Sequence, residues 1–142
     1  MVDPLVVKPK LMRYRILVVE DFPTIRNFIC DMLLTSGYDT VGVANLQDAW
    51  ATVSFSPSTI DLIVTDYYVP EGNGLELLKK IKSDPSTSSI PVIFLTAETN
   101  PEKINEAKTH GLYAWIVKPY RSATFFATIR AAFDAGREQR AH

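Results

Sequence analysis

Acidic, hydroxyl and basic side chains directly follow four short apolar runs of this sequence. Glu20 and Asp21 come after the first run, Asp66 and Thr96 after two later runs, and Lys118 after the last. Three carboxylates brought together repel one another unless a cation lies among them, and Mg²⁺ suits that place because it prefers oxygen ligands. A carboxylate can attack phosphorus while an ammonium and a hydroxyl hold the other phosphoryl oxygens. These residue types are those of a phosphoryl-transfer site.

The elements that must position these residues alternate between two patterns. From Arg15 onward, short apolar runs alternate with segments of helical period, which predicts a parallel sheet covered by helices on both faces. In such a sheet, ligands bind beyond the carboxyl ends of the strands. A polar residue after one buried strand usually just marks the return to solvent, but four such ends on a sheet about 20 Å across would converge on one crevice. The five runs, rich in β-branched residues, are Ile16 to Val19, Thr40 to Val43, Leu62 to Thr65, Val92 to Leu95 and Trp115 to Val117.

Helices are expected after each run. Asparagines stand where three of them would be capped, at Asn45, Asn73 and Asn100. The first helix should end at Gly37 and bury one apolar face, formed by Ile25, Phe28, Ile29, Met32 and Leu33. The last helix should follow Ser122 and turn inward Phe125, Ile129, Ala132 and Phe133.

Length and composition fit one domain. The 142 residues are 46% hydrophobic, which is enough for one core and leaves no room for a second catalytic or DNA-reading domain. A net charge of -1 gives no long-range field that favours nucleic acid or an anionic membrane. The single cysteine, Cys30, excludes an internal disulfide and fits a cytoplasmic location. We expect an N-terminal extension at residues 1–13 that is neither signal peptide nor membrane span, a domain at 14–136 and a tail at 137–142.

Four motifs make the sequence resemble the response-regulator receiver family, particularly its CheY-like members, over about Tyr14 to Phe133. The resemblance implies an α/β fold of flavodoxin-like type, with a doubly wound five-stranded parallel sheet of order 2-1-3-4-5 and five helices. The motifs occur in the family's order and spacing, and they are Val18-Val19-Glu20-Asp21-Phe22, Asp66-Tyr67-Tyr68-Val69-Pro70 with Gly74-Leu75-Glu76-Leu77-Leu78, Thr96-Ala97-Glu98 and Val117-Lys118-Pro119.

The resemblance also implies a role for each acidic motif residue. Asp66 would be the phosphorylated aspartate. Asp21, Asp66 and the backbone carbonyl of Tyr68 would ligate Mg²⁺, and Glu20 would reach the metal through water.

The remaining implied roles concern the phosphoryl group and the signal. Thr96 and Lys118 would contact the phosphoryl group, and the peptide bond between Lys118 and Pro119 would be cis. Thr96 and Trp115 would form the switch, although the indole N–H of Trp115 needs a partner when the ring turns inward. Trp115 stands where Tyr or Phe is usual, so its inward state should be harder to accommodate.

A stand-alone receiver is the function that this resemblance implies. A histidine kinase or a histidine phosphotransfer protein would phosphorylate Asp66, and a downstream protein would bind the face formed by helix 4, strand 5 and helix 5. No enzymatic activity is expected beyond Mg²⁺-dependent autophosphorylation and autodephosphorylation. The alternative is a receiver fold that serves as a phosphorylation-independent docking module or as a phosphate sink.

Several residues depart from the family's common pattern. Glu20 stands where an aspartate is usual, and Leu112 and Tyr113 replace small or acidic residues before the last strand. Tyr68 is bulky and could restrict access of water to the acyl phosphate. It also argues against an aspartate-nucleophile phosphatase of the haloacid dehalogenase type, which needs an acid at this position. A nucleotide-binding domain is disfavoured too, because the stretch after the first run offers Pro23 and a carboxylate in place of a glycine-rich loop.

Overall fold

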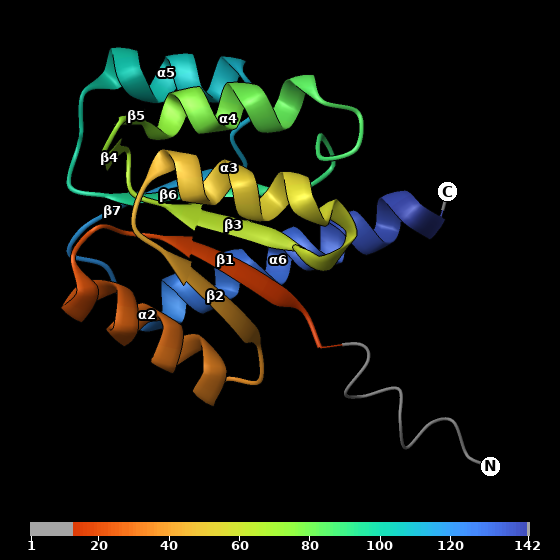
Figure 1. Cartoon of the computed structure of the whole chain (residues 1–142). Coiled ribbons are helices and arrows are strands. Elements are labelled where there is room, and N and C mark those ends of the chain that lie inside the picture. Colours follow the sequence, from red (N-terminus) through yellow and green to blue (C-terminus); the bar gives the residue numbers. More distant parts are fainter. Residues whose placement is uncertain (1–12, 142) are drawn as a thin grey trace.

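A five-stranded parallel sheet forms the centre of the molecule (Figure 1). The structure is a computed structural model that describes residues 13–141, with side chains described up to residue 136. The strand order β2-β1-β3-β6-β7 is the predicted order 2-1-3-4-5. The strands are β1 (Arg15–Val19), β2 (Asp39–Val43), β3 (Leu62–Thr65), β6 (Val92–Thr96) and β7 (Ala114–Val117).

The register brings the carboxyl ends of the strands to one edge of the sheet, where β6 runs two residues beyond the end of β3 because Thr65 pairs with Phe94. Val19, the last residue of β1, pairs with Val43 of β2 and with Thr65 of β3. Thr96 at the end of β6 pairs with Val117 at the end of β7. The residues that follow these strands therefore emerge along one edge of the sheet, as the sequence predicted.

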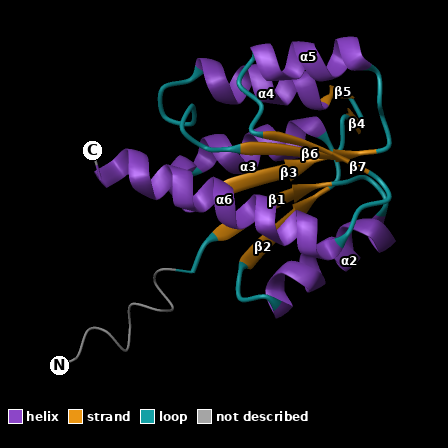
Figure 2. Cartoon of the chain, turned by 180° about the vertical axis from the view of Figure 1, so that it is seen from behind, coloured by secondary structure: helices purple, strands orange, loops and turns teal. Residues whose placement is uncertain are grey.

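Helices cover both faces of this sheet (Figures 1 and 2). One face carries α2 (Pro23–Thr35) and α6 (Ser122–Ala141), and the other carries α3 (Leu46–Phe55), α4 (Gly74–Ser83) and α5 (Pro101–Thr109). Alternate residues of β1 point to opposite faces, so that Leu17 joins one hydrophobic cluster and Ile16 the other. Both are fully buried, as expected for a parallel strand covered on both sides.

The predicted helix signals are confirmed at three N-termini. The side-chain oxygens of Asn45, Asn73 and Asn100 accept hydrogen bonds from backbone N–H groups of the first turns of α3, α4 and α5. Gly37 follows α2 with a φ of 98°, a left-handed conformation that glycine adopts without strain.

The predicted buried face of the first helix is partly wrong. Ile29 and Leu33 are buried, but Phe28 is 63% exposed and Ile25 is 38% exposed. The stripe that contacts the sheet runs through Arg26 instead, because its side-chain carbons lie directly above Gly42 of β2. Gly42 has no side chain, and the Arg26 stem and the Cys30 sulfur lie close to where one would be. The apolar face predicted for the last helix is confirmed.

A small hairpin after Asp66 was missed. The short antiparallel strands β4 (Tyr68–Val69) and β5 (Gly72–Asn73) join β3 to α4. A 3-10 turn, η1 (Pro57–Thr59), lies between α3 and β3. The hairpin matters for function because it fixes the backbone of Tyr68 beside the end of β3.

The described residues include only part of the predicted N-terminal extension and tail. Apart from Arg13, the predicted N-terminal extension lies outside the described residues. Helix α6 runs to Ala141. Within residues 13–141, no helix has the length and apolar character needed to cross a membrane.

Candidate functional site

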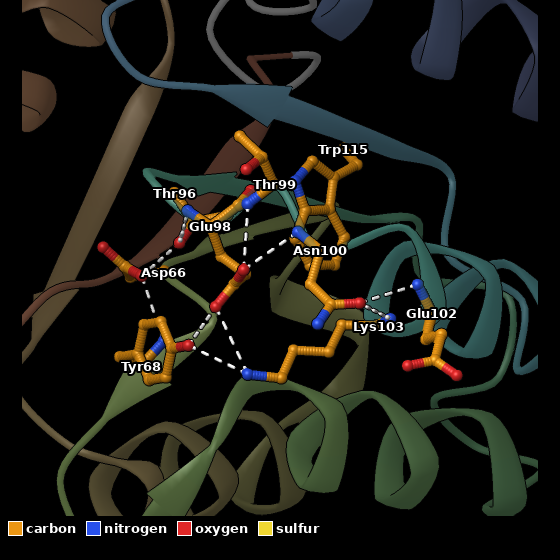
Figure 3. Close-up of polar contacts among 9 residues, drawn as sticks. All are labelled: Asp66, Tyr68, Thr96, Glu98, Thr99, Asn100, Glu102, Lys103 and Trp115. Atoms are coloured by element: carbon orange, nitrogen blue, oxygen red, sulfur yellow. Dashed lines mark hydrogen bonds and ion pairs between the residues drawn. The ribbon is translucent and has the colours of Figure 1, made fainter.

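Asp66 lies at the end of β3 with both carboxylate oxygens engaged. Its Oδ1 accepts a hydrogen bond from Thr96 Oγ1 at 2.8 Å and another from the Tyr68 N–H at 3.0 Å. Its Oδ2 lies 3.3 Å from Lys118 Nζ. These partners come from β6, β4 and the segment after β7, so three separate segments converge on this one carboxylate (Figure 3 shows the Thr96 and Tyr68 contacts).

Lys118 links the acidic residues of two strands. Its Nζ lies 3.3 Å from Glu20 Oε1 and 3.3 Å from Asp66 Oδ2. Burial alone would lower the pKa of Lys118, but the charges of Glu20 and Asp66 outweigh that effect and raise its pKa above the usual value. The ammonium therefore stays charged at neutral pH. The peptide bond between Lys118 and Pro119 is cis, as the resemblance implied.

Glu20 is a buried carboxylate, with only 3% of its surface exposed. Burial is the main reason that its pKa is raised, and a contact with Asp21 adds to the rise. The N–H of Phe22 donates to Glu20 Oε2 at 3.3 Å, and this bond together with Lys118 opposes the rise. Both carboxylate oxygens of Glu20 therefore already have partners.

A cavity of about 220 Å³ joins these side chains at the carboxyl edge of the sheet. One water molecule takes up about 30 Å³ of liquid volume, so several molecules of that size fit. All the residues predicted to bind metal or phosphate line it, together with three apolar residues. The lining consists of Glu20, Asp21, Phe22, Ile25, Asp66, Tyr68, Thr96, Ala97 and Lys118.

Trp115, the predicted switch residue, does not line this cavity. Its ring packs against Tyr67 and Phe94, with centroid distances of 5.6 and 5.4 Å. The indole N–H donates to the backbone carbonyl of Glu98 at 2.9 Å. The loop that follows β6 therefore supplies the partner that the indole N–H needs (Figure 3).

Sequence reasoning missed two charged residues beside the site. Glu98 accepts a hydrogen bond from the phenol of Tyr68, and Lys103 Nζ lies 3.1 Å from the same phenol oxygen. The position of Glu98, two residues after a strand-end hydroxyl, was a usable signal. Nothing in the sequence pattern of α5 sets Lys103 apart.

Comparison with known proteins identifies the family. The sequence profile of the response regulator receiver domain matches residues 16–130. The chain belongs to the response regulator receiver family. It is 32% identical over 120 residues to chemotaxis protein CheY-3 of Vibrio cholerae, and the matched region covers 84% of this chain and 92% of that protein. It is 35% identical over 107 residues to chemotaxis protein CheY1 of Helicobacter pylori, over 75% of this chain and 86% of that protein.

A solved receiver structure agrees with this assignment. The chain is similar to the chemotaxis response regulator CheY4 of Vibrio cholerae, with a TM-score of 0.77 and 29% identity over 84% of this chain and 98% of that one. The family membership makes this chain a receiver domain of two-component signalling, a system in which histidine kinases are the usual partners.

Receiver domains typically depend on Mg²⁺, and the oxygen donors of this cavity fit that ion. In the part of the chain that the structure describes, no group of three or more His, Cys, Asp and Glu side chains is arranged to hold a metal. Mg²⁺ commonly takes one or two protein carboxylates and completes its shell with waters and phosphate oxygens. Asp21 and Asp66 line the same cavity, so they could supply the two protein carboxylates.

Proposed function

We propose that this receiver takes a phosphoryl group on Asp66 in a Mg²⁺-dependent reaction and signals by binding another protein. The observation that carries the proposal is the set of partners around one carboxylate. Thr96, Lys118 and the Tyr68 N–H contact Asp66 from three separate segments. Positioned donors of this kind are what phosphoryl transfer needs, because its transition state spreads negative charge over several oxygens.

In the proposed reaction, a carboxylate oxygen of Asp66 attacks the phosphorus of a phosphohistidine. The new oxygen–phosphorus bond forms as the phosphorus–nitrogen bond breaks, and the imidazole leaves. The Thr96 hydroxyl and the Lys118 ammonium, which now hold the carboxylate, would hold phosphoryl oxygens. Asp21, Asp66 and the Tyr68 carbonyl would hold Mg²⁺, with Glu20 acting through water. The metal supplies neutralisation of charge on the transferred group.

The proposed partners follow from this chemistry. A histidine kinase or histidine phosphotransfer protein would donate the phosphoryl group, and a downstream protein would bind the face of α5, β7 and α6 in the cytoplasm. Trp115 supports that choice of output face because it lies on β7 and contacts the loop leading into α5. Movement of Thr96 toward the phosphoryl group would be passed on through this loop.

The decisive experiment is incubation with Mg²⁺ and acetyl phosphate, followed by intact-mass measurement. The mass should rise by one phosphate in the wild type and stay unchanged in Asp66→Asn. A Glu76→Gln variant, altered at an exposed acid of α4, serves as the matched control and should be phosphorylated normally. A wild-type chain that gains no mass would favour the alternative, a phosphorylation-independent docking module.

A phosphate sink would gain the same mass as a signalling receiver. The two are separated by measuring affinity for candidate partners with and without phosphorylation. A sink would show no difference in affinity between the two states.

A further inference from the structure

Glu98 connects the acceptor site to the loop that begins α5. Its Oε2 accepts hydrogen bonds from the N–H groups of Thr99 and Asn100, at 3.0 and 2.9 Å. Its Oε1 accepts the phenol of Tyr68 and lies 3.3 Å from Lys103 Nζ. The bond from Tyr68 is the main reason that the pKa of Glu98 is lowered, with the Asn100 N–H and Lys103 adding to it. The carboxylate is therefore ionised and held at a fixed place (Figure 3).

Lys103 completes this cluster from the first turn of α5. Its Nζ lies 3.1 Å from the Tyr68 phenol oxygen and 5.4 Å from the ring centroids of both Tyr67 and Tyr68. A cation over an aromatic face is attracted by the ring's electron distribution. One ammonium thus contacts a carboxylate, a phenol and two rings.

The helix itself gives no reason for a lysine at this position. The N-terminal end of a helix carries partial positive charge, so a cation in the first turn is disfavoured there. Asn100 already caps the N–H groups of this turn. The contacts that Lys103 makes across to β4 account for its presence better than helix stability does.

Tyr68 is the residue that these contacts hold in place. Tyr68 is one of the residues that line the Asp66 cavity, and 53% of its surface is exposed. An aromatic residue so exposed is weakly confined by packing. The ring contacts Tyr67 edge-on, at 5.0 Å between centroids, and this contact does not fix the direction of the phenol. Glu98 and Lys103 fix that direction.

We infer that Lys103 is a positioning residue for the chemistry at Asp66. Through Glu98 and its own contacts with the phenol, it holds the Tyr68 ring at the solvent-facing rim of the cavity and slows the approach of water. In the hydrolysis that it slows, the water oxygen bonds to phosphorus while the bond from phosphorus to the Asp66 oxygen breaks. Hydrogen phosphate and the aspartate carboxylate result; one proton of the water stays on the phosphate and the other passes to solvent. This inference rests on the proposed function.

The kinetic test compares loss of phosphate from Asp66 in four single variants and one double variant. Lys103→Ala should speed dephosphorylation by about twofold to fivefold, the range that an exposed ion pair of this kind contributes. Lys103→Arg should restore the rate to within about twofold of the wild type, because arginine keeps the charge and stacks on aromatic rings. Lys108→Ala removes an exposed lysine of the same helix and should leave the rate unchanged.

The fourth variant separates positioning from a general effect of charge. Tyr68→Ala should itself speed dephosphorylation, and adding Lys103→Ala to it should cause no further change. An unchanged rate in Lys103→Ala, or the same fold-change with and without Tyr68, overturns the inference.

A second measurement needs no phosphorylation. N-acetylimidazole modifies accessible phenols, and peptide mass analysis can compare Tyr68 with Tyr113, which is 41% exposed. Lys103→Ala should raise acetylation of Tyr68 relative to Tyr113, and an unchanged ratio contradicts the positioning role. If the wild type takes no phosphoryl group, both the proposed function and the kinetic part of the inference fail. Acetylation alone then decides whether Lys103 holds Tyr68.

Discussion

Glu20 and Asp21 are neighbours in the sequence, but their surroundings differ. Glu20 is almost fully buried, and its two carboxylate oxygens are occupied by Lys118 and the Phe22 N–H. Asp21 is only partly buried and lines the same cavity. Of these two carboxylates, Asp21 is the one more open to solvent and so to an incoming ion. This difference in burial favours the proposed inner role for Asp21 and outer role for Glu20.

We predict that Asp21→Ala weakens Mg²⁺ binding more than Glu20→Gln does. Loss of a direct ligand should exceed the loss of an outer contact by about tenfold in affinity, because outer contacts only orient the shell around the metal. Calorimetric titration of each variant with Mg²⁺ measures the difference. Equal losses in the two variants would mean that the division between inner and outer ligands is wrong.

At the scale of residues, the sequence predicted the parts of the site that belong to strand ends. Asp66, Thr96 and Lys118 each follow a recognisable apolar run, and parallel strands present such residues along one edge. The contacts of Glu98 and Lys103 with the Tyr68 phenol could not be predicted in this way. They depend on side-chain directions across 30 and 35 residues of sequence separation, for which periodicity carries no information.

Among the elements, α4 approaches the acceptor strand unusually closely at its first residue. A Cβ added to Gly74 would lie 2.9 Å from the Asp66 carbonyl oxygen and 3.2 Å from the Phe94 ring. The first of these distances is shorter than side chains tolerate, and the backbone on the other side cannot move without shifting Asp66. Gly74 is therefore needed for close packing of α4 against the end of β3.

We predict that Gly74→Ala destabilises the fold by about 1–3 kcal/mol, the usual cost of overpacking. Lys79→Ala, at an exposed position of the same helix, is the control and should change stability by less than about 0.5 kcal/mol. Urea unfolding of both variants gives the free energies. A Gly74→Ala variant as stable as the control would show that α4 can move away from β3.

The segment between α4 and β6 depends on a partly buried lysine. Lys82 Nζ donates hydrogen bonds to the carbonyl oxygens of Ser88 and Ile90, at 3.0 and 2.8 Å. Burial lowers the pKa of this lysine. The Lys82 ammonium is therefore the hydrogen-bond donor for these two backbone carbonyl groups.

We predict that Lys82→Met lowers stability at neutral pH by about 1–3 kcal/mol, because two partly buried carbonyl groups lose their donor. The pH dependence has a definite sign. Since the folded chain holds this proton less tightly than the unfolded chain, stability of the wild type rises with pH between the lowered pKa and 10.5. The gap between wild type and Lys82→Met should therefore widen over that window in urea unfolding. A constant gap would contradict the shifted pKa.

Element prediction succeeded where a pattern extended over several residues. Strands of four or five residues and capped helices gave clear signals. The hairpin of β4 and β5 did not, because two-residue strands are too short to show alternation. The exposure of Phe28 was not predicted, because helical spacing marks an apolar face without showing how much of it the sheet covers.

At the scale of the whole molecule, Trp115 connects the acceptor site with the proposed output face. In a Trp50→Phe background, beryllofluoride with Mg²⁺ should reduce iodide quenching of Trp115 and shift its emission, because the Thr96 hydroxyl, which donates to Asp66 here, would turn to the phosphate mimic. Because the ring already packs against Tyr67 and Phe94, the change in quenching should be modest. Binding of the phosphate mimic with no change in either signal would show that Trp115 is static.

The bond between Lys118 and Glu20 closes a loop of 98 residues. Glu20 follows β1 and Lys118 follows β7, and these strands are separated in the sheet by β3 and β6, so the contact needs all four strands in place. Contacts of such sequence separation form slowly and late. During refolding, competence to accept phosphate from acetyl phosphate should appear only when β7 has joined β6. The onset of phosphorylation at Asp66 should therefore report the final step of folding. An intermediate containing only β1, β2 and β3 would bury most of its apolar strands but would not be phosphorylated.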